Sequence, residues 1–405
     1  MLVPRMTRHS VIGATAGGTP GTLADEALAA AGTVATAPNA ARRAAANSDW
    51  NPDLLERMRD WFVVDGVVHL SNTLPNNVRR ERNTGAIDFV YAYHEKTTPA
   101  RYRIPQSQFA RSWQPEEGVD IWFLESPTAV AVYHSTPLYD QYWDGLNSNE
   151  KGAYLKVNYP QRMIWYGAVD LFEPLDRVKA KIDELASQGA DGLKFYPTRT
   201  DAVTLEPGAW FMNDRRRALP AFEHARDRGI RHIAVHKLLE YTGPETPALA
   251  IEDMYEAAAA LPDVSFELVH AGWLLLEETA ALMKKHENVV AIMEGPLLWL
   301  TYDLPAFHRM MAVFMNQVDV ERMIYSSVAT RQHPYWQLAG MLDYRPPAGA
   351  NFNVTEQAKR KILGENAARL YGIDIPTRRL ALAADRFSRE LARSGLREPF
   401  QAFRA

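Results

Sequence analysis

Cysteine is absent from the 405-residue chain. This excludes disulfides, Cys-ligated zinc, iron–sulfur clusters and thiol nucleophiles, so any metal site must use His, carboxylate, Lys-derived or water ligands. No apolar run approaches the roughly 20 residues that span a bilayer. The formal net charge of −4 gives no reason to expect nucleic acid or an anionic membrane as a partner. We therefore expect a cytoplasmic protein that contacts neither membrane nor nucleic acid.

Large apolar residues are scarce in residues 1–48, which are rich in Ala, Gly and Thr. Such a segment buries too little apolar surface to offset the entropy lost on ordering. It also lacks the long apolar core of a secretory signal. We therefore expect a mobile tail over residues 1–48, a main domain over residues 49–375 and a C-terminal helical extension over residues 376–405.

Several short apolar runs end on a residue that can bind metal or move a proton. Buried parallel strands have this continuous apolar character, and in a barrel their C-terminal ends meet at one mouth, where the chemistry sits. The pattern therefore predicts a polar or metal site at the mouth of a barrel. The residues at these run ends are His69, His134, Lys194, His236, His270 and Glu294.

Strand-like runs alternate with helical stretches along the main domain. The repeated β-then-α order predicts parallel pairing, and eight strands predict a closed (β/α)8 barrel of the TIM type. An open doubly wound sheet is the rival fold, but no Gly-rich dinucleotide loop follows the first strand. Besides the runs that end at His69 and His134, the predicted strands are Arg162–Ala168, Gly192–Tyr196, Arg231–Val235, Val264–Val269, Asn288–Met293 and Arg322–Tyr325. The predicted helices are Pro174–Gln188, Asp214–Arg228, Ile251–Ala260, Glu277–His286, Pro305–Gln317 and Val354–Leu370.

Two regions do not fit the alternation. Ser71–Gly118 is a long insert between the first two strands, and long loops of this kind commonly cap a barrel mouth. Thr377–Ala405 carries many arginines around an apolar stripe and predicts one extra amphipathic helix, suited to docking on the barrel or on a partner subunit.

Several segments resemble the amidohydrolase-related family, in the metal-dependent branch that includes aminocarboxymuconate semialdehyde decarboxylase. Asp65–His69 resembles its first-strand motif Asp-x-His-x-His, and Gly189–Pro197 its fourth-strand segment. His236 and His270 match the fifth- and sixth-strand histidines. Ile362–Leu370 closely matches the closing helix, the most specific of these similarities. The resemblance covers roughly residues 62–375 and implies a metal-dependent barrel.

Two positions depart from the family pattern. The first histidine of the first-strand pair is Val67, and the eighth-strand aspartate, a metal ligand and proton acceptor in the family, falls on Val328. A valine cannot coordinate a cation, so the standard metal site of the family cannot form. We expect both valines to pack as apolar side chains beside the missing ligand positions.

The remaining residues still predict a site for one divalent metal. Three imidazoles hold zinc with one open position, and a neighbouring carboxylate also suits iron or manganese. We expect His69, His236 and His270 as ligands, Glu294 or Lys194 as the acid/base, and His134 in the substrate pocket. The structural alternatives are an ion pair between Lys194 and Glu294, and a His69 that pairs with Asp65.

The depleted site leaves three functions open. The first expectation is a metal-binding subunit of a heteromer, whose homologous sister subunit holds the complete site. Such a pair would act on a small carboxylate or amino-acid-like substrate, as in an oxygen-activating hydroxylase (monooxygenase) of this fold. The alternative is a stand-alone single-metal hydrolase or decarboxylase of a small organic acid. A third possibility is a non-catalytic binding protein that kept the fold.

Overall fold

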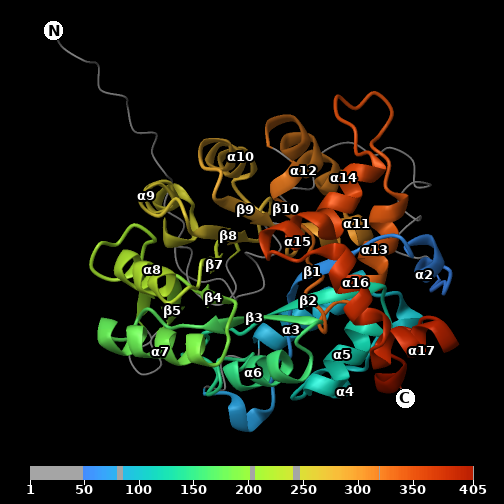
Figure 1. Ribbon diagram of the computed structural model, residues 1–405, viewed down its shortest axis with the longest axis horizontal. Helices are drawn as coiled ribbons and strands as arrows, with labels where there is room; N and C mark the ends of the chain where they lie inside the picture. The colour runs from blue at the N-terminus through green and yellow to red at the C-terminus, as the bar shows by residue number, and fades with distance from the viewer. Residues whose placement is uncertain (1–48, 80–84, 201–205, 240–246, 319, 405) are drawn as a thin grey trace, which may run out of the picture. The chain divides into compact units, whose positions relative to one another are not determined.

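The computed structural model describes residues 49–79, 85–200, 206–239, 247–318 and 320–404 (Figure 1). The predicted mobile tail over residues 1–48 lies outside the described residues. Within the part of the chain that is described, no helix is long and apolar enough to cross a membrane.

Eight parallel strands form the centre of the fold, as predicted. They are ordered β1-β2-β3-β4-β7-β8-β9-β10. The final pairing, between the segment after β10 and β1, is made by backbone hydrogen bonds from Gly66 N to Tyr325 O (2.8 Å) and from Val328 N to Val67 O (3.1 Å). These bonds close the sheet into a barrel. The strands are β1 (Val63–Val68), β2 (Thr128–His134), β3 (Met163–Ala168), β4 (Gly192–Phe195), β7 (His232–His236), β8 (Ser265–Val269), β9 (Val289–Ile292) and β10 (Met323–Ile324).

Helices follow the strands in the order that the sequence pattern predicts. The expected helices correspond to α7 (Leu175–Ser187), α8 (Ala218–Asp227), α9 (Glu252–Ala260), α10 (Leu276–Lys285), α12 (Leu304–Gln317) and the pair α14 (Glu356–Arg360) and α15 (Asn366–Leu370). The sequence pattern missed α2 (Leu54–Arg57), α5 (Pro115–Phe123), α6 (Asn149–Asn158), α11 (Trp299–Tyr302), α13 (Pro334–Asp343) and the short hairpin of β5 (Thr198–Thr200) and β6 (Pro207–Ala209). Helix α6 has a weak apolar face but a clear start, because the Ser148 side chain accepts a hydrogen bond from Lys151 N.

The closing helix is held against the barrel by two residues of its motif. Gly364 lies in the π-helical turn between α14 and α15, where an added Cβ would be 1.6 Å from Phe62 O. Asn366 Nδ2 donates to Val320 O (2.6 Å) and to Met323 O (2.9 Å). The motif therefore fixes this helix against β1 and β10. This packing role explains why the motif is specific to the family although its residues carry no chemistry.

The insert and the C-terminal extension pack on the barrel. The insert contains α3 (Gly85–Thr97) and α4 (Gln106–Phe109), and α3 reaches the mouth. The extension is not one helix, as expected, but two, α16 (Ile375–Ala383) and α17 (Arg386–Ser394). The break occurs because the Asp385 side chain caps α17 by accepting from Ser388 N. Asp385 also pairs with buried Arg162 at 2.6 Å, which docks the extension on the barrel.

The barrel interior is mostly apolar and contains one polar cluster. Valine and isoleucine side chains of β1, β2, β8, β9 and β10 fill much of it. In the N-terminal part of the interior, four side chains form what we call the lower cluster: Tyr166, His232, Glu267 and Tyr371. Glu267 Oε1 accepts hydrogen bonds from Tyr166 OH (2.5 Å) and from His232 Nδ1 (3.2 Å), and the hydroxyls of Tyr166 and Tyr371 are 3.3 Å apart. The lower cluster is thus a network of side chains bonded to one another, in which Glu267 Oε2 is left without a partner among the described residues.

Candidate active site

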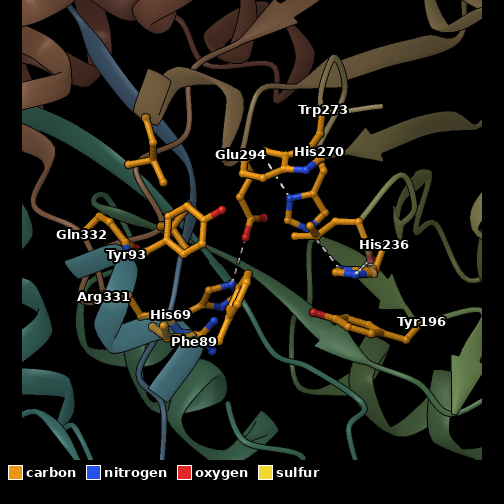
Figure 2. Close-up of a pocket in the computed structure, with 15 residues that line it drawn as sticks. His69, Phe89, Tyr93, Tyr196, His236, His270, Trp273, Glu294, Arg331 and Gln332 are labelled. Atoms are coloured by element: carbon orange, nitrogen blue, oxygen red, sulfur yellow. Dashed lines mark hydrogen bonds and ion pairs between the residues drawn. The ribbon is translucent and has the colours of Figure 1, made fainter. Parts of the chain in front are cut away.

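Four of the six predicted site residues meet in one pocket at the C-terminal mouth. His69 follows β1, His236 ends β7, His270 follows β8, and Glu294 comes after β9. All four line a pocket with about 570 Å³ of space, part of it open to solvent (Figure 2). The other two residues, His134 and Lys194, are buried but are not among the residues that line the pocket.

The ring of His69 is oriented by the neighbouring strand. Its Nδ1 lies 3.0 Å from His134 O, and a carbonyl oxygen only accepts, so Nδ1 carries the hydrogen. The lone pair of Nε2 is therefore left for the pocket, where Glu294 Oε1 is 3.8 Å away. His69 does not pair with Asp65, contrary to the structural alternative.

His236 and His270 face each other across the pocket wall. His270 Nδ1 donates to Glu294 O (3.1 Å), and His236 Nε2 donates to Leu239 O (2.8 Å). The remaining nitrogens, His270 Nε2 and His236 Nδ1, are 3.1 Å apart. In the neutral state both are acceptors, so no hydrogen lies between them. Two lone pairs thus point at the same space.

Burial keeps these imidazoles neutral. It lowers the pKa of His69, lowers the pKa of His236 well below its usual value, and lowers the pKa of His270 to about 4. Neutral imidazole is the form that ligates metals or accepts a proton. The three rings therefore enter any reaction near neutral pH as bases or ligands.

Glu294 is ionised without a direct ion pair to Lys194. Burial raises the pKa of Glu294, but His270, His69 and Lys194 outweigh this effect and hold the pKa well below its usual range. Burial lowers the pKa of the Lys194 ammonium to about 8, opposed by Glu294 and Glu267. Among the described residues no carboxylate forms an ion pair with Lys194, so the alternative of a Lys194–Glu294 ion pair is wrong.

The donor set suits a cation, although the ligand shell is incomplete. In the described part of the chain, no three His, Asp or Glu side chains lie close enough together to hold an ion as they stand. The facing lone pairs of His236 and His270 nevertheless form a two-nitrogen site for a divalent ion, and each ring is held by a carbonyl as metal-bound histidines are. His69 and Glu294 lie in the same pocket and are the residues able to complete a shell.

Val67 and Val328 occupy the places that the family alignment assigns them. Val67 lies in β1 and is fully buried, and Val328 follows β10 and lines the pocket. The backbone of Val328 has φ 64°, the left-handed region that is unfavourable for a β-branched residue and better tolerated by aspartate. The backbone at position 328 thus suits the aspartate of the family pattern, whereas the valine side chain that is present cannot bind a metal.

Asp65 has a structural role at the seam of the barrel. Its Oδ1 accepts from Ser327 N (2.9 Å), and its Oδ2 contacts Ser327 Oγ, which in turn accepts from Ala329 N (3.0 Å). Burial raises the pKa of Asp65 to about 7, although the hydrogen bonds from Ser327 oppose this shift. Asp65 therefore holds the segment after β10 against β1.

The sequence pattern missed most of the pocket walls. Aromatic side chains of α3 and of the loops after the strands surround the polar groups, and Arg331 adds a positive charge at the rim. Arg331 is oriented by donating to Ser71 Oγ through Nε (3.1 Å) and Nη2 (3.0 Å). The only sequence signal for these residues is their position just beyond strand ends or in the insert. The aromatic residues are Phe89, Tyr93, Tyr196 and Trp273 (Figure 2).

A family model described as amidohydrolase matches residues 129–373, more than half of the chain. A search of curated proteins found no match.

Solved structures share the fold at low sequence identity. An uncharacterized TIM-barrel protein from Bordetella bronchiseptica is 16% identical with a TM-score of 0.55, and the match covers 80% of this chain and 99% of that chain. 2,6-Dihydroxybenzoate decarboxylase in complex with 2,6-dihydroxybenzoate is 11% identical with a TM-score of 0.50, over 77% of this chain and 99% of that chain. A dihydroxybenzoic acid decarboxylase from Polaromonas sp. JS666, solved with bound manganese, is 10% identical with a TM-score of 0.49, over 78% of this chain and 98% of that chain.

Proposed function

Because the chain belongs to the amidohydrolase family, we propose that it is a stand-alone enzyme that hydrolyses or decarboxylates a small organic acid. The observation that carries this proposal is the convergence of three neutral imidazoles and one ionised carboxylate in a single mouth pocket. Perturbed groups gathered in a cleft at this end of a barrel are typical of a catalytic site.

A divalent metal ion is the cofactor that the family implies, and His236 and His270 are the residues that would hold it. Their unprotonated nitrogens face each other at 3.1 Å, and whichever of His69 and Glu294 does not act as proton acceptor is available to complete the shell. When bound, such an ion would polarise a carboxylate or carbonyl oxygen and lower the pKa of a coordinated water. Zinc, manganese and iron all suit nitrogen and carboxylate ligands.

The pocket selects a small anion with an apolar body. Arg331, held by Ser71, places a positive charge at the rim, which attracts a carboxylate and slows the entry of cations. The rings of Phe89, Tyr93 and Trp273 give flat apolar walls for the rest of the molecule.

Proton transfer falls to Glu294 and His69. Glu294 is ionised and His69 is neutral, with Glu294 Oε1 and His69 Nε2 3.8 Å apart, so both groups accept a proton. In hydrolysis one of them takes the proton from the attacking water. In decarboxylation the carbon that loses CO₂ takes up a proton that one of these groups has first accepted from water, so that the carboxylate and water give the protonated product and bicarbonate.

The stand-alone enzyme has more support than our first expectation, a companion subunit of a heteromeric monooxygenase. The fold is shared with a decarboxylase of a small aromatic acid, and the pocket combines a base, imidazoles and an anion-attracting rim. A requirement for a sister subunit has no observation in its favour.

Turnover by the isolated chain tests the proposal. The purified protein, stripped with a chelator and reloaded with Mn²⁺ or Zn²⁺, would be incubated with small carboxylic acids labelled with ¹³C at the carboxyl carbon. Release of labelled CO₂ or bicarbonate, or hydrolysis of lactones and amides followed by pH-stat, is the expected result. The control is the His236→Ala/His270→Ala double variant. Turnover only with a co-expressed sister chain would favour the companion subunit, and no turnover in either case would favour a binding protein.

A further inference from the structure

Beneath the mouth pocket lies a second polar layer that its lining residues do not include. Lys194 and His134 form this layer, and both are buried, with exposures of 1% and 0%. Lys194 pairs in register with Ala168 of β3 and Ala234 of β7, so small side chains flank it on both sides. Ala234 belongs to the cluster that fills the barrel interior, so Lys194 faces the interior as well.

His134 is fully buried with no hydrogen bond from either ring nitrogen to any described residue. Its ring stacks on Tyr166, with centroids 4.4 Å apart and planes within 9°, which fixes its position. A neutral imidazole has one N–H donor and one acceptor, and leaving such groups unpaired in an apolar interior is unfavourable. A ring held this firmly and left unbonded is typical of a residue that waits for a ligand.

The ammonium of Lys194 is buried close to the pocket. Its Nζ lies 5.5 Å from the centre of the Tyr196 ring. Tyr196 lines the mouth pocket, so Lys194 lies just beneath it. The positive charge of Lys194 also acts on His134, His236 and Glu294, which places it among the site residues.

Glu294 is a second unsatisfied group beside His134. Its Oε2 atom is buried and has no hydrogen-bond partner among the described residues. Lys194 and Glu294 attract each other but do not form a direct ion pair. Arg331 at the rim and Lys194 below place a positive charge on two sides of the pocket, which favours an anion there.

We propose that Lys194 and His134 form the floor of the pocket and bind a carboxylate group of the molecule that occupies it. One carboxylate oxygen accepts from Lys194 Nζ and the other from the N–H of His134. The aromatic walls then hold the body of the ligand above the floor. The identification of this ligand as a substrate rests on the proposed function, but its binding does not.

Binding of two matched probes tests the floor directly. Benzoate and its neutral isostere benzamide would be titrated against the whole chain by calorimetry, with the fluorescence of the wall residue Trp273 as a second signal. We expect benzoate to bind at least about tenfold tighter than benzamide, a charge-assisted preference of the usual size. Lys194→Met should abolish that preference, because benzoate loses a charge-assisted partner whereas benzamide loses a weaker hydrogen bond to a neutral acceptor. The surface control Lys284→Met should change neither affinity.

Other variants keep the inference falsifiable. His134→Phe keeps the stacking on Tyr166 and should reduce benzoate affinity about threefold without affecting benzamide. If Lys194→Met fails to fold by circular dichroism, Lys194→Gln replaces it. The inference is overturned if wild type binds neither probe, if it binds both equally, or if Lys194→Met keeps the preference while Arg331→Met loses it. If the chain binds benzoate through Lys194 but turns over no acid, the proposed function is contradicted, while the inference that Lys194 and His134 bind a carboxylate still holds.

Discussion

The barrel holds two buried polar regions that differ in where their hydrogen bonds go. In the lower cluster the side chains bond to one another, with Glu267 accepting from Tyr166 and His232. At the mouth the imidazoles of His69, His236 and His270 donate outward to backbone carbonyls, and their free nitrogens point inward to the pocket. Both regions are shielded from solvent, so burial does not distinguish them.

The difference separates a structural polar group from a functional one. A buried network whose members satisfy each other rigidifies the fold, and removing one member leaves the others unpaired. A ring held by a carbonyl on one side and left open on the other is positioned for a partner that is not part of the chain. We therefore expect changes in the lower cluster to alter stability and changes at the mouth to alter activity.

The largest effect should come from Glu294→Gln at the mouth. Loss of the ionised carboxylate removes the proton acceptor beside His69, and general acid–base catalysis contributes about 10²–10⁴-fold. We expect turnover of the acid found in the ¹³C screen to fall about 10³-fold, while the urea midpoint changes by less than that of any lower-cluster variant. Glu287→Gln, on an exposed residue, is the matched control. If Glu294→Gln lost stability as well as activity, the mouth would not differ from the lower cluster in the way we expect.

Glu267→Leu should show the opposite behaviour. It leaves the hydroxyl of Tyr166 and the ring of His232 without their acceptor in the interior, which costs about 3 kcal/mol of unfolding free energy. Urea denaturation followed by circular dichroism measures this loss. Glu267→Gln retains an acceptor oxygen for both donors, so it should lose about 1 kcal/mol. A Leu variant as stable as wild type would show that the lower cluster contributes no stability.

Asp65, at the seam between β1 and β10, tests whether a third buried group is structural. Its pKa of about 7 lies above the ordinary 3.8, so the folded protein keeps a proton that the unfolded chain releases. The stability from this group is therefore fully present below pH 3.8 and is lost as the pH rises to about 7. Between pH 5 and pH 7 the loss should be about 2 kcal/mol.

The matched variant for this test is Asp65→Asn, which keeps both contacts to Ser327 but does not titrate. The difference between wild type and variant in unfolding free energy should shift by that amount across pH 5 to pH 7, measured by urea denaturation. Parallel pH profiles for the two proteins would contradict the assignment.

The smallest expected effect is an increase in metal affinity at the mouth. Val67→His together with Val328→Asp restores two family ligands, and aspartate is better tolerated than valine at the positive φ of position 328. We expect the affinity for Mn²⁺ or Zn²⁺ to increase about tenfold, measured by calorimetry, because each added ligand favours binding. The control is the single variant Val67→Ile, which adds bulk but no ligand. An unchanged affinity with the fold intact would count against the alignment at the mouth.

The sequence alone was enough to predict the barrel and the strand ends that carry the site. Continuous apolar runs that end at His69, His236, His270 and Glu294 indicate both strand and polarity, because buried parallel strands leave their polar residues at one end. The C-terminal extension was less predictable, since a single capping residue, Asp385, divides one expected helix into two. Helices with weak apolar faces, such as α6, were missed because they lack the periodic pattern that predicts a helix; the start of α6 is marked by a capping residue, Ser148.

Only the tertiary structure decided how the polar residues divide their roles. The sequence places Lys194 and Glu294 at similar strand ends and cannot tell an ion pair from two groups held apart. It cannot show that Asp65 bonds to Ser327 rather than to His69, because that choice depends on how β10 closes on β1. The periodicity that predicts a strand is a local property, because it depends only on neighbouring residues. Hydrogen-bond partners in a closed barrel come from strands hundreds of residues apart, and their pairing is set by register and packing.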